Sequence, residues 1–210
     1  MKRCVVFCAA EFDTLAAALE PSDLVIAADG GLSHTNALGI QPDLILGDFD
    51  SLGYIPRDSR VYPVEKDDTD LMLAIRAGLE NGCTEFLFYG ALDGPRLDHT
   101  VANFQALNYL CNHGAFGWLI GRDYIITSVK NGALHFSPEA SGILSVFCQG
   151  SDAKGVTIKG LHYTLEHAGL SAGFPLGVSN HFTGQAASIE VLDGTLLVMW
   201  DRANGLCRRE

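Results

Sequence analysis

Five short apolar runs divide the first 121 residues of this 210-residue chain. Each run is continuous rather than alternating, and Gly, Pro or Asp bounds it; they cover residues 4–10, 23–31, 42–50, 85–91 and 116–121. Parallel strands that are buried on both faces have this pattern. The sequence therefore predicts a parallel sheet.

Three segments between these runs have the composition or spacing of helices. Residues 13–20 are rich in Ala and Leu and stop at Pro21, apolar residues recur every fourth position within 69–82, and one apolar face runs through 98–114. Strands that alternate with helices indicate a doubly wound α/β domain. We assign this domain to residues 1–123.

The helical spacing disappears after about residue 123. Strand-like segments follow, separated by Gly, Ser, Asn and Asp turns, and Leu192-Asp193-Gly194-Thr195 predicts a hairpin between two of them. We therefore expect an all-β domain over residues 124–210, built as a β-sandwich.

Composition excludes several classes of function. The formal charge of −11 argues against sequence-independent binding of nucleic acid, because phosphate contacts need a basic face. No stretch is long enough to span a bilayer, and the first apolar run is too short for a signal peptide. Six cysteines without metal-ligand spacing indicate reduced thiols in a cytoplasmic protein.

Carboxylates follow the predicted strands where each strand ends. Asp29 lies at the end of the second run, Asp48 and Asp50 end the third, and Arg96 and Asp98 lie in the loop after the fourth. A further acidic segment, residues 65–70, begins the next helix. The carboxyl ends of parallel strands meet at one edge of a sheet, where ligands of such sheets bind. Carboxylates gathered there predict a bound cation, and oxygen ligands favour Mg²⁺ or Mn²⁺.

The spacing of these residues adds a geometric expectation. If the strand continues past Gly47, Asp48 and Asp50 point to one side and Phe49 points into the packing, because side chains alternate along a strand. Gly47 would leave room beside them. Asp67 and Asp70, three residues apart, would share the exposed side of a first helical turn.

Structural roles remain alternatives for several of these residues. Asp67 or Asp68 could cap a helix with Asp70 favoured by the helix dipole, and Asp98 could be a cap as well. The Asp29-Gly30-Gly31 stretch could be an ordinary strand-to-helix turn. The sequence also has no GxxxxGK[ST] loop and no GxGxxG fingerprint. Nucleotide phosphates would therefore be held by a metal ion, glycine amides and cations such as Arg96.

Five motifs resemble thiamine pyrophosphokinases, in that family's order and at similar spacing. They are ADGG (28–31), PDLILGDFDS (42–51), DDTD (67–70), GPRLDHTVAN (94–103) and GLHYTLEHAGLSAGFPLGVSN (160–180). The resemblance covers roughly residues 20 to 200. It implies an α/β domain followed by a β-sandwich, and transfer of pyrophosphate from ATP to the hydroxyl of thiamine. It also implies a homodimer with thiamine bound at the interface between subunits.

The resemblance also implies roles for individual residues. The expected metal ligands are Asp48, Asp50, Asp67 and Asp70. The expected ATP-binding residues are Asp29, Gly30, Gly31, Asp67, Gly90 and Arg96. The expected thiamine-binding residues are Asp98, Ser179, Asn180 and Trp200. Asp48, Asp50, Asp70, Arg96 and Asp98 form the expected catalytic set.

Two departures from the family pattern affect these roles. The glycine-rich loop GALDGPRLDH is a residue longer than common bacterial versions, which leaves the roles of Asp93 and Gly94 open. In eukaryotic relatives, a tryptophan near the C-terminus stacks on thiamine. The nearest alignment places Val198 at that position in this chain, and we expect Trp200, two residues later, to take its role.

Two other functions also remain open: another Mg²⁺-dependent nucleotide diphosphotransferase or hydrolase, and a thiamine or nucleotide binding protein without turnover.

Overall fold

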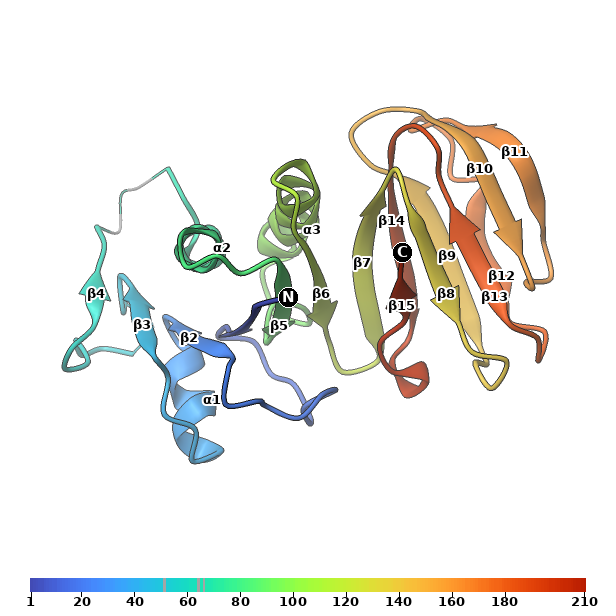
Figure 1. Ribbon diagram of the computed structural model, residues 1–210. Helices are drawn as coiled ribbons and strands as arrows, with labels where there is room; N and C mark the ends of the chain where they lie inside the picture. The colour runs from blue at the N-terminus through green and yellow to red at the C-terminus, as the bar shows by residue number, and fades with distance from the viewer. Residues whose placement is uncertain (51, 64, 66) are drawn as a thin grey trace. The chain divides into compact units, whose positions relative to one another are not determined.

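The structure is a computed structural model that describes residues 1–50, 52–63, 65 and 67–210. Ser51, at the end of the third motif, and Lys66, within the acidic segment, lie outside the described residues. The chain divides into two compact units, Met1–Arg122 and Asp123–Glu210. Figure 1 labels the elements of both units.

The first unit contains a parallel sheet in the order β6-β5-β1-β2-β3-β4. Its strands are β1 (Arg3–Phe7), β2 (Leu24–Ala28), β3 (Leu44–Gly47), β4 (Arg60–Val61), β5 (Glu85–Tyr89) and β6 (Phe116–Ile120). The residues of β1, β2, β5 and β6 are buried apart from the first of each strand. Burial on both faces explains why these segments are continuous apolar runs.

Three helices connect these strands: α1 (Gly31–Ala37), α2 (Asp70–Glu80) and α3 (Leu97–Asn112). Figure 1 shows α1 on one side of the sheet and α2 and α3 on the other. Within the sheet, β2 lies next to β1 at one edge and β5 lies next to β1 at its other edge. The strand order therefore reverses at β1. This is the doubly wound arrangement, and its ligand crevice opens where the order reverses.

One predicted helix is absent from the first unit. Residues 13–20 contain no helix, and the chain from Cys8 to Asp23 runs as turns and irregular segments. Tyr89 of β5 holds this segment, because its hydroxyl accepts a hydrogen bond from the Ala16 N–H at 3.1 Å. The Ala and Leu content predicted a helix that tertiary contacts override.

The second unit contains two antiparallel sheets. One has the order β12-β9-β14-β7, with strands Gly177–His181, Ile143–Cys148, Thr195–Asp201 and Tyr124–Lys130. The other has the order β11-β10-β13-β8-β15, with strands Leu165–Leu170, Ala153–Lys159, Ala187–Glu190, Ala133–Phe136 and Arg208–Arg209. A short 3-10 helix, η1 (Arg202–Asn204), follows β14. Phe136 and Trp200 meet edge to face at 5.2 Å between the sheets, as expected for a β-sandwich.

The predicted hairpin at residues 192–195 is wrong. β13, which precedes the turn, pairs with β10 and β8, whereas β14, which follows it, pairs with β7 and β9. The turn therefore carries the chain from one sheet to the other. The turn residues are typical of a hairpin, but the partner of each strand is decided by distant residues.

Two further observations concern the whole described chain. Among the described residues, no helix is long and apolar enough to cross a membrane. No disulfide links the six cysteines, which all fall within the described part of the chain, and Cys4, Cys83 and Cys207 are buried.

Candidate active site

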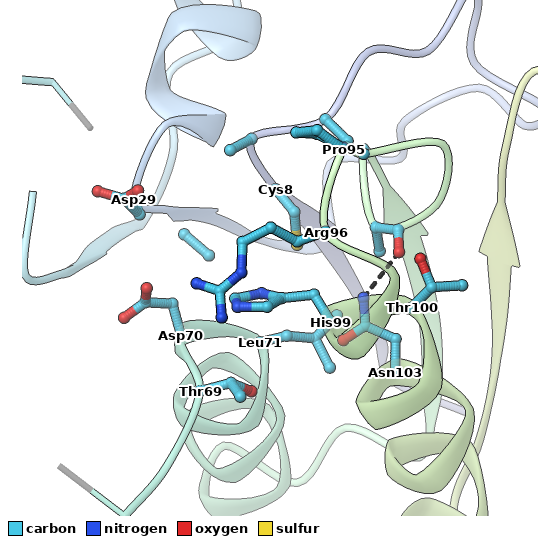
Figure 2. A pocket seen from close by; sticks show the side chains of 16 residues that line it. Cys8, Asp29, Thr69, Asp70, Leu71, Pro95, Arg96, His99, Thr100 and Asn103 are labelled. Atoms are coloured by element: carbon cyan, nitrogen blue, oxygen red, sulfur yellow. Dashed lines mark hydrogen bonds between the residues drawn. The ribbon is translucent and has the colours of Figure 1, made fainter. Parts of the chain in front are cut away.

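A cavity of about 370 Å³ opens at the carboxyl edge of the parallel sheet, where the strand order reverses. The residues that follow β1, β2 and β5 line it, together with the first turns of α2 and α3. Figure 2 shows Asp29, Asp70, Arg96 and His99 around it. The cavity therefore lies at the place where doubly wound folds bind ligands.

Backbone hydrogen bonds join two walls of the cavity. The Cys8 N–H donates to the Tyr89 carbonyl at 2.8 Å, and the Ala10 N–H donates to the Gly90 carbonyl at 2.9 Å. Gly90 has a φ of 68°, and a Cβ atom there would lie 2.4 Å from the Ala10 carbonyl oxygen. Glycine at position 90 is thus required by the close approach of the two segments. Gly90 lines the cavity, and its part in ATP binding stays a prediction.

Asp48 and Asp50 lie close together, but the expected reason is wrong. β3 ends at Gly47, and Phe49 adopts a left-handed conformation with a φ of 61°. The N–H groups of Leu52 and Gly53 both donate to the Phe49 carbonyl, each at 3.2 Å. A tight turn, rather than strand alternation, therefore brings the two carboxylates together. Phe49 itself is buried, as the sequence predicted.

Asp29 joins these two residues in a three-carboxylate cluster. One oxygen from each of Asp29, Asp48 and Asp50 lies within 4.8 Å of the other two. The close approach depends on Gly47, because a Cβ atom there would lie 3.1 Å from the Asp29 backbone. The Asp29 N–H also donates to the Leu46 carbonyl at 2.8 Å, which fixes β2 against β3 at this point.

The geometry of this cluster fits a divalent cation. Mg²⁺ binds oxygen at about 2.1 Å, so opposite ligands of an octahedral ion lie about 4.2 Å apart. Adjacent ligands of such an ion lie about 3.0 Å apart, so three oxygens within 4.8 Å of one another lie in the range from which one ion could be held by all three. Asp29, predicted for ATP binding, thus lies with Asp48 and Asp50 in the carboxylate cluster. The sequence did not assign it there because it precedes Asp48 by nineteen positions and lies on another strand.

The acidic segment before α2 contributes differently from the prediction. Asp70, the first residue of α2, lines the cavity, whereas Asp67 is exposed and belongs to neither the cavity lining nor the described carboxylate cluster. Asp68 pairs with Arg76 at 3.1 Å. The helix cap is Thr69, whose hydroxyl accepts a hydrogen bond from the Met72 N–H at 3.2 Å, so neither Asp67 nor Asp68 is the cap.

The pKa of the Cys8 thiol depends on burial and on nearby charges in the cavity. Burial, together with the negative charges of Asp70 and Asp29, raises the pKa of its thiol to about 12. A raised thiol pKa means that a further negative charge is unfavourable at this point. Burial, the largest cause, disfavours a charge of either sign, whereas the smaller effect of Asp70 and Asp29 would favour a cation.

Arg96 and Asp98 form an exposed ion pair at the start of α3. Arg96 Nη2 lies 2.6 Å from Asp98 Oδ2, and both side chains are about two-thirds exposed. The hydrogen bond from Arg96 lowers the pKa of the Asp98 carboxyl, which therefore stays ionised at neutral pH. Arg96 is the N-cap residue of α3, so Asp98 is not the cap. Figure 2 shows the Arg96 side chain pointing across the cavity toward Asp29 and Asp70.

Three further residues of the cavity wall were not predicted from the sequence: His99, Thr100 and Asn103. They share one face of α3 with Arg96, so helical spacing from position 96 could have found them. Asn103 is buried, and its Nδ2 donates to the Ala91 carbonyl at 2.7 Å, a bond drawn in Figure 2. Asn103 thereby ties α3 to the loop after β5.

Gly30 and Gly31 lie next to the cavity without lining it. Gly30 is the N-cap of α1, and Gly31 begins that helix. A Cβ atom on Gly31 would clash with the Phe7 carbonyl, so the glycine lets α1 pack against β1. Their predicted ATP-binding role stays a prediction.

The predicted thiamine-binding residues Ser179 and Asn180 form hydrogen bonds within the second unit. Asn180 is buried, its Oδ1 accepts from the N–H groups of Tyr163 and His181, and its Nδ2 donates to the Tyr163 carbonyl. Ser179 is exposed, has a φ of 60°, and donates its N–H to Ser145 Oγ at 3.1 Å. Ser179 is therefore available to a ligand, while Asn180 shapes the strand that presents it.

The position of Trp200 contradicts the prediction that it stacks on thiamine. Its side chain is fully buried, its Nε1 donates to the Gly205 carbonyl at 2.9 Å, and its ring packs against Phe136. A ring within the sandwich core has no free face for a ligand. The expected stacking on thiamine is therefore not a role of Trp200 in this structure.

Comparison with known proteins agrees with the two-unit architecture. The catalytic domain model of thiamin pyrophosphokinase matches residues 15–115, and the vitamin B1 binding domain model matches residues 133–196. A thiamine pyrophosphokinase of Bacillus subtilis is 27% identical over 185 residues, covering 84% of this chain and 86% of that protein.

Solved structures share the fold. The crystal structure of the thiamine pyrophosphokinase from Bacillus subtilis has a TM-score of 0.83 at 24% identity, covering 94% of this chain and 98% of that one. The thiamin pyrophosphokinase of Candida albicans has a TM-score of 0.72 at 17% identity, covering 94% and 88%. Because both family models match in order and together span most of the sequence, the chain belongs to the thiamine pyrophosphokinase family.

Proposed function

We propose that this protein transfers the pyrophosphoryl group of ATP to the hydroxyl of thiamine, giving thiamine diphosphate and AMP. One observation supports this most strongly: Asp29 belongs both to the three-carboxylate cluster and to the cavity wall. A cation held by the cluster would thus lie beside a ligand in the cavity, as phosphoryl transfer from a nucleotide requires. Both family matches agree with this reaction.

The metal site of the proposal consists of Asp29, Asp48 and Asp50. Mg²⁺ bound there would neutralise phosphate oxygens and orient the phosphate chain for in-line attack. Asp70 lies in the cavity wall at the first position of α2, where it can bind a water of the metal's hydration shell. Asp67 remains a weaker candidate ligand, since it is exposed and outside the cluster of described carboxylates.

Arg96 and Asp98 complete the proposed catalytic set. The Arg96 guanidinium points into the cavity and can pair with phosphate oxygens, whose negative charge would compete with that of Asp98. Asp98 is exposed, and the hydrogen bond from Arg96 lowers the pKa of its carboxyl further, so it carries a negative charge at neutral pH. An ionised carboxylate next to the nucleotide suits the cationic thiazolium ring of thiamine. We assign Ser179 of the second unit to thiamine binding on the basis of its motif and its exposure.

A homodimer is part of the same proposal. Phe174, Leu176 and Val178 are 66, 55 and 43% exposed, and they lie within five residues of one another around the start of β12. Exposed apolar side chains in such a group are typical of a surface that a protein partner covers. Sedimentation equilibrium measures the state directly, and a monomer at micromolar concentration would contradict this part.

The reaction is tested by incubating the purified protein with ATP, Mg²⁺ and thiamine and measuring AMP and thiamine diphosphate. We expect equal amounts of the two products and neither product when thiamine is left out. AMP release that does not depend on thiamine would indicate a nucleotide hydrolase instead. Calorimetric binding of thiamine without any diphosphate product would indicate a binding protein.

A further inference from the structure

The loop that joins β5 to α3, residues 90–96, forms one wall of the cavity and ends at Arg96. Its first residues are held by two hydrogen bonds: the Gly90 carbonyl accepts from the Ala10 N–H, and the Ala91 carbonyl accepts from Asn103 Nδ2. Arg96 lies five residues further along and has a long side chain that is 66% exposed. Asp98 pairs with its guanidinium, while the middle of the loop sets how the backbone enters Arg96 at the start of α3.

Asp93 holds the middle of the loop. Its Oδ2 accepts a hydrogen bond from the Arg122 N–H at 2.8 Å, just beyond the end of β6. The carboxylate lies directly over Gly121, where a Cβ atom would come within 2.7 Å of Asp93 Oδ2. Leu92 is buried and would also lie against that Cβ atom, at 3.1 Å. The tip of the loop is thus fitted to a glycine at the end of the neighbouring strand.

The backbone of Asp93 supports the same arrangement. Its φ is 62°, a left-handed conformation that Asp and Asn adopt more readily than most residues. Only Gly94 and Pro95 separate Asp93 from Arg96, and proline fixes its own φ and restricts the residue before it. Proline thus removes one of the few rotations between Asp93 and Arg96, so a displacement of Asp93 would change the direction in which the loop enters Arg96.

We propose that Asp93 is a positioning residue, which anchors the loop to the end of β6 so that Arg96 faces the phosphates of ATP. The proposal rests on the proposed function, because it assigns Asp93 a task in placing Arg96 for that reaction. Asp93 itself does not line the cavity, so its effect passes through Arg96.

The side chain of Arg122 provides a matched control. Its guanidinium lies 3.1 Å from Glu11 and 3.6 Å from Asp13, and all three side chains are at least half exposed. Such exposed ion pairs contribute little to stability. An Arg122→Ala variant removes these ion pairs but keeps the backbone N–H that Asp93 binds.

Three substitutions of Asp93 separate the hydrogen bond from the backbone conformation. Asp93→Asn keeps an acceptor oxygen and tolerates the left-handed backbone, Asp93→Gly tolerates the backbone without an acceptor, and Asp93→Ala has neither property. For each variant we would measure kcat, the KM for ATP and for thiamine, and the Tm. Calorimetry with Mg²⁺ and a non-hydrolysable ATP analogue, and hydrogen exchange of the Arg122 amide, give readouts independent of turnover.

We expect Asp93→Gly and Asp93→Ala to raise the KM for ATP by about fivefold, since a lost hydrogen bond to a charged, solvent-exposed acceptor has about this effect. The analogue should bind more weakly by the same factor, and the Arg122 amide should exchange faster. The KM for thiamine should stay within about twofold in each variant, and Asp93→Asn and Arg122→Ala should resemble the wild type in every readout.

An Asp93→Gly variant with the wild-type KM for ATP and wild-type affinity for the analogue would overturn the proposal. Equal increases in both KM values would do so as well, because they would indicate general disruption of the fold. If the wild-type protein itself formed no thiamine diphosphate, the proposed function would fail. The analogue affinities and the Arg122 exchange rates would then still decide whether Asp93 positions the loop.

Discussion

The two units of this protein use the polar residues of their motifs in different ways. In the α/β unit, Asp29 and Asp70 line a cavity at the sheet edge, and Asp29 shares a cluster with Asp48 and Asp50. In the β unit, Asn180 and Trp200 direct their polar atoms to backbone groups of their own unit. These predicted site residues of the α/β unit are thus placed to contact a ligand, whereas Asn180 and Trp200 of the β unit stabilise its fold. Substitutions should separate the two cases by whether activity or stability changes.

The largest effect is expected for the carboxylate cluster. Asp48→Asn or Asp50→Asn removes one charged ligand, and kcat should fall by about a thousandfold because the charge on the phosphates is no longer neutralised. The Tm should not fall, since carboxylate repulsion is relieved. Steady-state kinetics and thermal unfolding measure both quantities. Asp68→Asn is the control, because Asp68 pairs with Arg76 outside the cluster, and near-normal turnover by Asp48→Asn would disprove the metal role.

The next largest effect is a loss of stability in the β unit. Asn180→Ala leaves two backbone N–H groups and the Tyr163 carbonyl without their partner, and the free energy of unfolding should fall by about 2–3 kcal/mol. Asn180→Asp keeps the acceptor oxygen and should lose less. Urea denaturation gives the values. Unchanged stability together with a higher KM for thiamine would instead place Asn180 among the ligand-binding residues.

A smaller loss of stability is expected for Trp200. Trp200→Phe keeps an aromatic ring in the core but removes the hydrogen bond to the Gly205 carbonyl, so unfolding should become easier by about 1–2 kcal/mol. The KM for thiamine should remain as in the wild type. A raised KM at unchanged stability would show that the tryptophan does stack on thiamine.

The smallest expected effect is on the pH dependence of stability. The folded-state pKa of Cys8 is raised to about 12 from its ordinary value of 9.0, so the folded protein keeps a proton that the unfolded chain releases above pH 9. Stability is therefore lost as pH rises between these values, by roughly 1 kcal/mol at pH 10. Urea denaturation at pH 8 and pH 10, under reducing conditions, should show a smaller loss for Cys8→Ala than for the wild type. Equal losses would mean that burial and the neighbouring carboxylates do not raise the pKa of this thiol.

Local patterns predicted the parallel sheet, α2, α3 and the edge where the site lies, because each of these depends on residues near one another in the sequence. Burial of β1, β2, β5 and β6 on both faces leaves continuous apolar runs, and the strand ends then place Asp29, Asp48 and Asp50 at one edge. The left-handed turn at Phe49 was missed because Phe rarely adopts this conformation and nothing in its neighbours marks it.

The sequence predictions that the structure contradicts concern segments whose conformation depends on residues far away in the sequence. Residues 13–20 had the composition of a helix, but Tyr89 holds the segment in another conformation. Trp200 was expected at a ligand because the family position, Val198, lies two residues away on the same face of β14. Both side chains are fully buried, and the packing of Trp200 against Phe136 of β8 could not be predicted from the local sequence.

The turn at residues 192–195 has a consequence for how fast the β unit can fold. Because it joins two sheets, β14 finds its partners far away in the sequence, with Thr195 opposite Lys130 and Leu196 opposite Cys148. Chains dominated by such distant pairings fold slowly, since long loops must close before the pairings form. Stopped-flow refolding should therefore show the β unit forming later than α2 and α3, whose hydrogen bonds connect residues within a few positions of one another. While β14 is unpaired, the edges of β7 and β9 are exposed, and the newly made chain is then most prone to aggregate.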